Sequence, residues 1–195
     1  MASILKVDTI QDQSGNNIIN ESADTITIGA SGDTITIPTG ASLTVPSGGL
    51  TGQNYPAFQA TLSSDQSVTN EVTTKLEADT ELFDTDNCYD NVTNYRFTPN
   101  VAGKYLVYTM FGFDSTANDT NVQQQIRLYK NTTEVARSWQ ILTSDERLVV
   151  MSPSFVQDMN GTTDYLELFG FISALAGSTT KFYRDTWWGA YRIGD

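Results

Sequence analysis

The stretch that most constrains the fold is residues 95–113, because it contains a strand with two apolar faces. Pro99 and Asn100 break the run and Gly103 restarts it, as in a turn that leads into a strand. A sheet with one face in water alternates apolar and polar residues, whereas both faces of this strand are apolar. One face fits a second sheet, and the other fits a second copy of the chain. Because successive side chains alternate, the two rows are Tyr105, Val107, Thr109, Phe111 and Phe113, and Leu106, Tyr108 and Met110.

The composition supports a packed core and excludes several classes of function. Apolar residues make up 39% of the 195 residues, and the formal net charge is −12, from 11 Lys+Arg and 23 Asp+Glu. An acidic surface repels phosphate backbones, so no nucleic-acid partner is expected. No apolar run approaches the ~20 residues of a membrane helix, and residues 1–13 do not read as a signal peptide. We therefore expect no membrane partner.

Residues 1–22 predict a short hairpin with a polar turn at residues 13–17. A lone hairpin is marginal in water, so this segment is either a loose terminus or an anchor that orders by adding strands to a partner. Apolar residues on both arms favour the anchor. They are Ile4, Leu5, Val7 and Ile10 on the first arm, and Ile18 and Ile19 on the second.

Residues 23–49 contain an internal repeat of three short units, in which threonine alternates with an aliphatic residue before a Gly, Pro or Ser turn. Small units with one apolar face cannot fold singly and must stack. One chain offers too few apolar side chains for a core, so we expect three chains to intertwine as a β-stalk. The alternative is a flexible linker. The predicted stalk core is Ile26, Ile28, Ile35, Ile37, Leu43 and Val45.

A Gly-rich linker at residues 50–56 separates the stalk from an all-β head at residues 57–195. Many short strands with turns between them are typical of a sandwich or jelly roll. The segment 165–172 again has two apolar faces. We expect Tyr105, Tyr108, Phe111 and Phe169 in the head core or in a trimer interface. The strands are predicted at 57–62, 66–76, 92–98, 103–113, 122–130, 133–141, 147–157, 163–172 and 180–193.

The head resembles the C1q/TNF-like jelly roll over about residues 57–194. The block from Tyr89 to Tyr105, Tyr-Asp-x-x-x-x-Tyr-x-Phe-Thr-Pro-x-x-Ala-Gly-x-Tyr, carries most of this resemblance. The segments Leu128-Tyr-Lys-Asn-Thr-Thr-Glu-Val and Trp188-Gly-Ala-Tyr-Arg-Ile-Gly are similar to the family's hairpin and closing strand. The chain departs from the family in that the glycine usual before this Phe-x-x-Pro stretch is replaced by Asn94 or Tyr95, and no collagen repeat precedes the head. The resemblance implies a homotrimeric jelly roll.

The whole chain also resembles a class of marine tailed-phage virion proteins. The resemblance rests on the start Met-Ala-Ser-Ile-Leu-Lys-Val-Asp-Thr-Ile-Gln-Asp, the Gly-Asn-Asn-Ile-Ile turn, the Thr-Ile-Thr-Ile repeats and the C1q-like head. It implies a fibre, spike or decoration protein at the virion surface. Residues 1–22 would then be a virion anchor that binds capsid or tail proteins. The head would be displayed for attachment to a host-surface glycan.

The sequence gives little support for a metal site, a cofactor or catalysis. Asp84-x-Asp-x-x-x-Asp90 suggests a calcium loop, but Tyr89 and Tyr95 stand where an EF-hand needs Gly and Glu, so a polar turn is the favoured interpretation. Cys88 has no basic neighbour and is expected to be an inert, buried or semi-buried thiol. There is no histidine to serve as a general base, and no spacing marks a pair of carboxylates as in a glycosidase. We expect no catalytic residue, no metal and no cofactor.

These observations predict a non-enzymatic, homotrimeric virion protein, a fibre or spike that gains avidity from three copies of a weak contact. A capsid decoration or cement protein is the alternative within this class. A secreted C1q-like lectin or ligand is the alternative from another class, and a sugar-degrading fibre enzyme is a third. The receptor-binding residues cannot be assigned from the sequence.

Overall fold

The computed structural model contains two compact units, Met1–Gly52 and Gln53–Asp195. Every regular element in the described residues is a β-strand. No helix in the described part of the chain is long and apolar enough to cross a membrane. The described residues are 9–11, 13–15, 17–22, 25–28, 32, 34–42, 55–115, 121–175 and 177–194.

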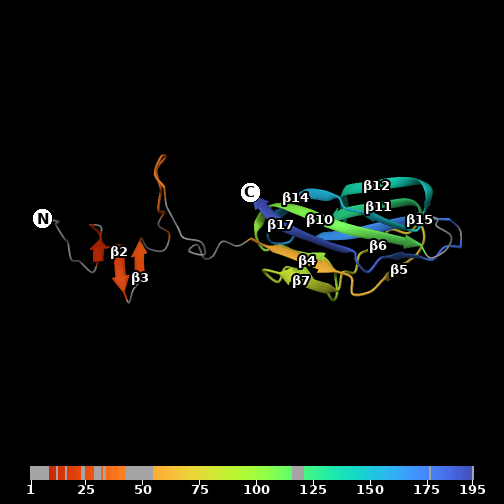
Figure 1. The fold of residues 1–195 in the computed structure, drawn as a ribbon. Coiled ribbons are helices and arrows are strands. Elements are labelled where there is room, and N and C mark those ends of the chain that lie inside the picture. The colour runs from red at the N-terminus through yellow and green to blue at the C-terminus, as the bar shows by residue number, and fades with distance from the viewer. Residues whose placement is uncertain are drawn as a thin grey trace. The chain divides into compact units, whose positions relative to one another are not determined.

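The first unit contains a small antiparallel sheet, in the order β1-β2-β3 (Figure 1). Its strands are β1 (Thr9–Gln11), β2 (Asn17–Ser22) and β3 (Thr25–Ile28). The predicted hairpin is formed by β1 and β2, in which Ile10 pairs with Ile19. The strand of the first repeat pairs with it in turn, since Ile19 also lies opposite Ile28. Residues 34–38 of the second repeat form no strand in the single chain, so the intertwined stalk stays a prediction.

The second unit is a sandwich of two antiparallel sheets (Figure 1). One sheet has the order β5-β16-β10-β17-β4-β7, and β13 and β14 also pair with β10; the other has the order β12-β11-β15-β9-β8, and β6 pairs with β15. The strands are β4 (Ala57–Thr61), β5 (Gln66–Val68), β6 (Thr74–Lys75), β7 (Thr80–Asp84), β8 (Tyr89–Asp90), β9 (Arg96–Phe97), β10 (Ala102–Ser115), β11 (Asn121–Lys130), β12 (Thr133–Glu146), β13 (Leu148–Met151), β14 (Ser154–Asn160), β15 (Leu166–Ala174), β16 (Thr180–Phe182) and β17 (Trp187–Gly194).

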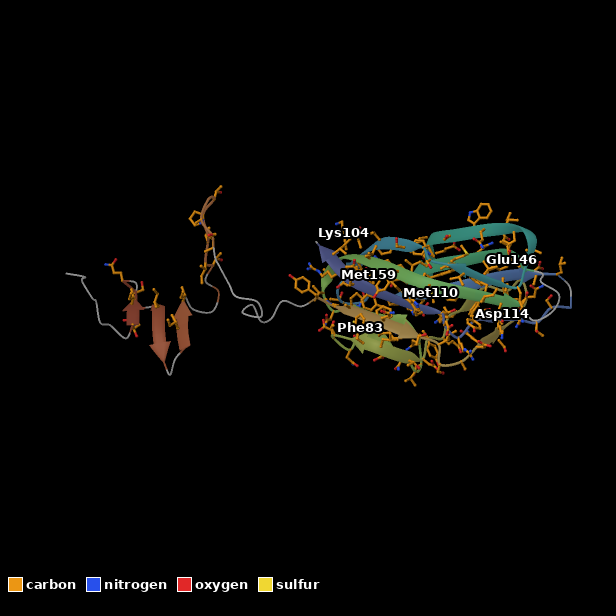
Figure 2. All side chains as sticks on the ribbon, in the orientation of Figure 1. Phe83, Lys104, Met110, Asp114, Glu146 and Met159 are labelled. Carbon is orange, nitrogen blue, oxygen red and sulfur yellow. The ribbon has the colours of Figure 1, made fainter. Side chains whose placement is uncertain are left out.

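Strand β10 is the centre of its sheet, as its two apolar faces predict. It pairs with β14 and β13 along one side and with β17 and β16 along the other. Figure 2 shows Lys104 near one end of this strand and Asp114 near the other, with Met110 between them. Gly103, at the start of the strand, has a φ of 143°, and a side chain there would meet the Gly194 carbonyl. The glycine therefore allows β10 and β17 to come together at this end.

The core contains two aromatic clusters between the sheets. Phe58 stacks on Tyr89 at 4.4 Å and on Phe97 at 4.7 Å between ring centroids, and meets the edge of Trp188 at 4.8 Å. The second cluster joins Phe111, Phe113 and Phe182, with centroids 4.6 to 5.9 Å apart. A Cβ at Gly170 would lie 2.6 Å from Phe182 and 2.7 Å from Phe111. The missing side chain on β15 therefore makes room for the second cluster.

Several predicted strands are shorter than expected or divided. Residues 66–76 form β5 and β6 with a turn between them, where Glu71 has a φ of 62°. Residues 147–157 divide into β13 and β14 at Pro153, because proline cannot donate a ladder hydrogen bond. Residues 180–193 divide into β16 and β17 at a turn in which Thr186 N donates to Tyr183 O. The sequence did not predict β7 and β8, which lie at the sheet edges.

Candidate assembly surface

The second apolar face of β10 lies on the outside of the sandwich. Tyr105, Val107 and Phe111 point inward and are fully buried. The alternating residues Leu106, Tyr108 and Met110 point outward and are only half-buried in the single chain. The outer face therefore contains apolar side chains that the chain itself does not cover.

Tyr108 lies at the middle of this face, and the backbone of β17 makes space for it. Tyr108 pairs with Gly189 across the strands, and a Cβ on Gly189 would lie 2.7 Å from the Tyr108 hydroxyl. The absence of that Cβ allows the phenol ring to lie close over β17. Its centroid is 5.7 Å from that of Trp187 and 5.9 Å from that of Tyr191. Burial raises the pKa of Tyr108 above its usual value, with a smaller contribution from Tyr191, so the hydroxyl is neutral at physiological pH.

Exposed apolar side chains continue this face on the neighbouring strands. Leu106 pairs with Val156 on one side and with Tyr191 on the other. Phe83 on β7 pairs with Gln59 and extends the face toward the sheet edge (Figure 2). The ion pair between Lys104 and Asp158, 3.3 Å long and exposed, lies at the rim. We define the outer apolar face as Phe83, Leu106, Tyr108, Met110, Val156, Trp187 and Tyr191.

A second exposed apolar patch lies on β12, the edge strand of the other sheet. Trp139 is 59% exposed, and Val135 and Ile141 are also exposed. Trp188 is fully buried and Trp187 is half-buried. Trp139 is therefore the most exposed of the three tryptophans. β12 lies at the sheet edge, and its exposed apolar side chains stand on both sides of the charged Arg137; exposed edge strands invite pairing with another chain. We define the β12 edge patch as Val135, Trp139 and Ile141.

The four aromatic residues expected in core or interface lie in three different places. Tyr105 and Phe111 lie in the core, and Tyr108 lies on the outer apolar face. Phe169 lies on the outer side of the second sheet, because the alternation of β15 turns Leu168 inward instead. Its ring is half-buried, 4.5 Å from that of Tyr129 and 5.8 Å below the Lys75 ammonium. Phe169 is therefore outside both the core and the outer apolar face.

The predicted anchor and stalk residues are described only in part. The side chains of Ile10, Ile19, Ile26, Ile28, Ile35 and Ile37 are exposed in the single chain, as expected if their partner is another chain. The side chains of Ile4, Leu5, Val7, Ile18, Leu43 and Val45 lie outside the described residues. The assignment of both groups stays a prediction.

The Asp84–Asp90 segment is a turn whose carboxylates bind the backbone of their own loop. Asp84 accepts hydrogen bonds from the amides of Asp86 and Tyr89 and from the Cys88 thiol. Asp90 accepts from the amides of residues 92, 93 and 94 and from the Asn94 side chain. Within the described residues, no three His, Cys, Asp or Glu side chains come together to hold a metal ion. The segment is therefore a turn that its own carboxylates stabilise, and the expectation that it holds no metal stays a prediction.

Cys88 is buried, and burial raises the pKa of its thiol well above the usual value. The neighbouring Asp84 carboxylate, which accepts from the thiol at 3.2 Å, adds to this shift. The expected burial of Cys88 is therefore seen. A thiol that stays protonated is a poor nucleophile, and the inertness of Cys88 stays a prediction.

Comparison with known proteins supports the fold and identifies no sequence family for the chain. No protein-family model matches the sequence, and no curated protein is similar to it. Murine APRIL at pH 5.0 matches 72% of this chain and 100% of its own, with 12% identity and a TM-score of 0.50. Murine APRIL at pH 8.0 matches with 9% identity and a TM-score of 0.49, and Eiger TNF from S. frugiperda with 12% identity and a TM-score of 0.46. The match with a TM-score of 0.50 confirms the predicted C1q/TNF-like domain at the level of the fold: the chain contains a TNF-like jelly roll.

Proposed function

We propose that this chain is a non-enzymatic virion structural protein, a homotrimeric fibre or spike that displays its jelly-roll head for host attachment. The main support for the proposed trimer is the outer apolar face, which a single chain leaves uncovered. Monomeric proteins rarely expose large contiguous apolar patches, and such patches mark interaction sites. The aromatic centre formed by Tyr108, Trp187 and Tyr191, with a charged pair at the rim, is typical of protein interfaces.

Two different patches favour a closed ring over a two-fold dimer. A two-fold interface needs one patch that is complementary to itself, whereas a ring needs two different patches that meet head to tail. The outer apolar face and the β12 edge patch lie on different sheets of the sandwich. In the proposed trimer, the β12 edge patch of one protomer packs on the outer apolar face of the next.

The virion role is supported by the N-terminal unit and by the resemblance of the whole chain to phage virion proteins. The exposed isoleucines of β1–β3 and of residues 34–38 need partners, and an anchor and an intertwined stalk supply them. Three heads on one stalk multiply a weak surface contact, because binding of the second and third heads is intramolecular.

Sedimentation equilibrium of the full chain and of residues 55–195 tests the trimer. Both species are expected at three times the protomer mass, which is 21.4 kDa for the full chain. A monomeric head with a trimeric full chain would assign assembly to residues 1–52 and refute the interface. Immunogold labelling of virus particles purified from the source of the chain tests the virion role. Labelled fibres or spikes support it, label spread over the capsid supports a decoration protein, and unlabelled particles refute it.

A further inference from the structure

A polar hollow of about 390 Å³ lies between the edge strands of the two sheets, β7 and β8. Glu81 from β7, Asn87 and Asn91 from the loops that flank β8, and Arg96 and Thr98 from β9 and the residue after it line this hollow. These side chains belong to neither the outer apolar face nor the β12 edge patch, so the proposed assembly does not use them.

The side chains of the hollow differ in how far their polar groups are already occupied. The carboxylate of Asp90, which also lines the hollow, is occupied by the loop of residues 92–94. The side-chain amide nitrogen of Asn91 donates to Asp79 O, which leaves the side-chain oxygen of Asn91 open to a ligand. Within the described part of the chain, the side-chain polar groups of Glu81, Asn87 and Arg96 have no hydrogen-bond or ion-pair partner in the protein, whereas the backbones of Glu81 and Arg96 pair in the sheets. An acid, a base and an amide therefore face one hollow without satisfying one another.

Arg96 is held in place by stacking rather than by an ion pair. Its guanidinium lies 4.5 Å from the centroid of the Tyr165 ring. A guanidinium has five N–H donors in a rigid plane, and stacking on a ring leaves those at its edge free. On the facing strand, partial burial and the charge of Asp84 raise the pKa of Glu81. No salt bridge between Glu81 and Arg96 is present in the described residues, so both charged groups that line the hollow are open to a ligand.

We propose that this hollow binds a neutral sugar residue of a host-surface glycan, an inference that rests on the proposed attachment function. Hydroxyl groups accept from Arg96, donate to Glu81, and do both with the side-chain amides of Asn87 and Asn91. An apolar ligand fits poorly, because apart from Cys88 and Tyr89 the lining side chains are polar or charged. An anionic ligand meets the carboxylates of Glu81 and Asp90 as well as the single cation. A metal ion lacks the necessary group of three ligands in the described residues.

Saturation-transfer NMR with the full chain tests this site. The probes are D-glucose, D-galactose, D-mannose, N-acetyl-D-glucosamine and D-glucuronic acid. We expect saturable binding of at least one neutral sugar. We expect that Glu81→Gln and Arg96→Gln each weaken it about tenfold, as for the loss of one charged hydrogen bond. Asn87 has a φ of 54°, so Asn87→Gly removes the amide at a position whose backbone favours glycine, and a similar loss is expected.

Glu77→Gln is the matched control, because Glu77 is an exposed carboxylate that lines a different hollow. Thermal unfolding of each variant shows whether the fold is kept. Absence of saturable binding, binding of glucuronic acid alone, or equal weakening by Glu77→Gln would each overturn the proposal. A trimer that binds no sugar would refute this site and leave the proposed assembly intact. A monomer whose sugar binding depends on Arg96 would support this site and refute the proposed assembly.

Discussion

Replacement of Tyr191 by alanine is the sharpest test of the outer apolar face. Tyr191 is 43% exposed in the single chain. An aromatic side chain buries ~150–250 Å², so the exposed part of Tyr191 is roughly 65–110 Å². At ~25 cal/mol per Å², covering this surface contributes about 2 kcal/mol at each interface.

The effect is multiplied by the symmetry of the trimer. A ring of three protomers has three equivalent interfaces, so Tyr191→Ala is expected to cost about 6 kcal/mol per trimer. Because 1.4 kcal/mol is a factor of ten, the association constant falls by about four powers of ten. Three protomers associate, so the protomer concentration at half-dissociation varies as the inverse square root of that constant. It is expected to rise about 100-fold.

Sedimentation equilibrium of residues 55–195 over a wide concentration range measures this shift. Val92→Ala is the control, because Val92 is 74% exposed in the turn between β8 and β9, outside the outer apolar face. Tyr191 also contacts Tyr108 within the protomer, so urea unfolding of the dissociated variant is needed to show that the fold is kept. An unchanged midpoint for Tyr191→Ala, or an equal shift for Val92→Ala, would refute the assignment of this face.

Three further predictions concern the head alone. Phe58→Ala is expected to lower the free energy of unfolding by about 3–5 kcal/mol, measured in urea, because it removes the ring that Tyr89, Phe97 and Trp188 contact; a loss below ~1 kcal/mol would contradict the described core. The Thr93 amide and its neighbours hold the pKa of Asp90 at about 2, below the ordinary 3.8. The wild type should therefore lose stability as the pH falls from about 4 to about 2, and Asp90→Asn should flatten that part of the acid unfolding curve; parallel curves would contradict this role. Cys88 should react with an aromatic disulfide reagent only after unfolding in denaturant, and rapid reaction of the native protein would show that the thiol is accessible.

The sequence predicted the central elements of the head because their apolar pattern is strong. The two faces of β10 are both visible in the order of the residues, and the structure places one face in the core and the other outside. Similarly, Gly103 at the start of β10 has a φ of 143°, which glycine adopts readily. Patterns of this kind depend on residues that are close together in the chain, so they can be recognised from the sequence alone.

The edge strands and the polar hollow could not be predicted in the same way. Strand β7 is exposed along most of its length, so it has no alternation of apolar and polar residues to mark it. Strand β8 has only two residues, and the sequence predicted a polar turn in this segment rather than a strand. Glu81 and Arg96 face one hollow only because the two sheets pack together. The sequence alone also does not say which face of β15 turns inward. It therefore could not show that Phe169 lies outside the core.

The charge distribution of the head is consistent with separate surfaces for assembly and attachment. The chain has 23 acidic and 11 basic residues, so protomers repel one another wherever their carboxylates approach. The outer apolar face contains no charged side chain among the residues that define it, which makes it the surface where three acidic protomers can meet at least electrostatic cost. The hollow, by contrast, keeps Glu81 and Arg96 available to a polar ligand. A trimer joined through the apolar face would therefore present three copies of the hollow, and a weak affinity at each would suffice if all three reach the same surface.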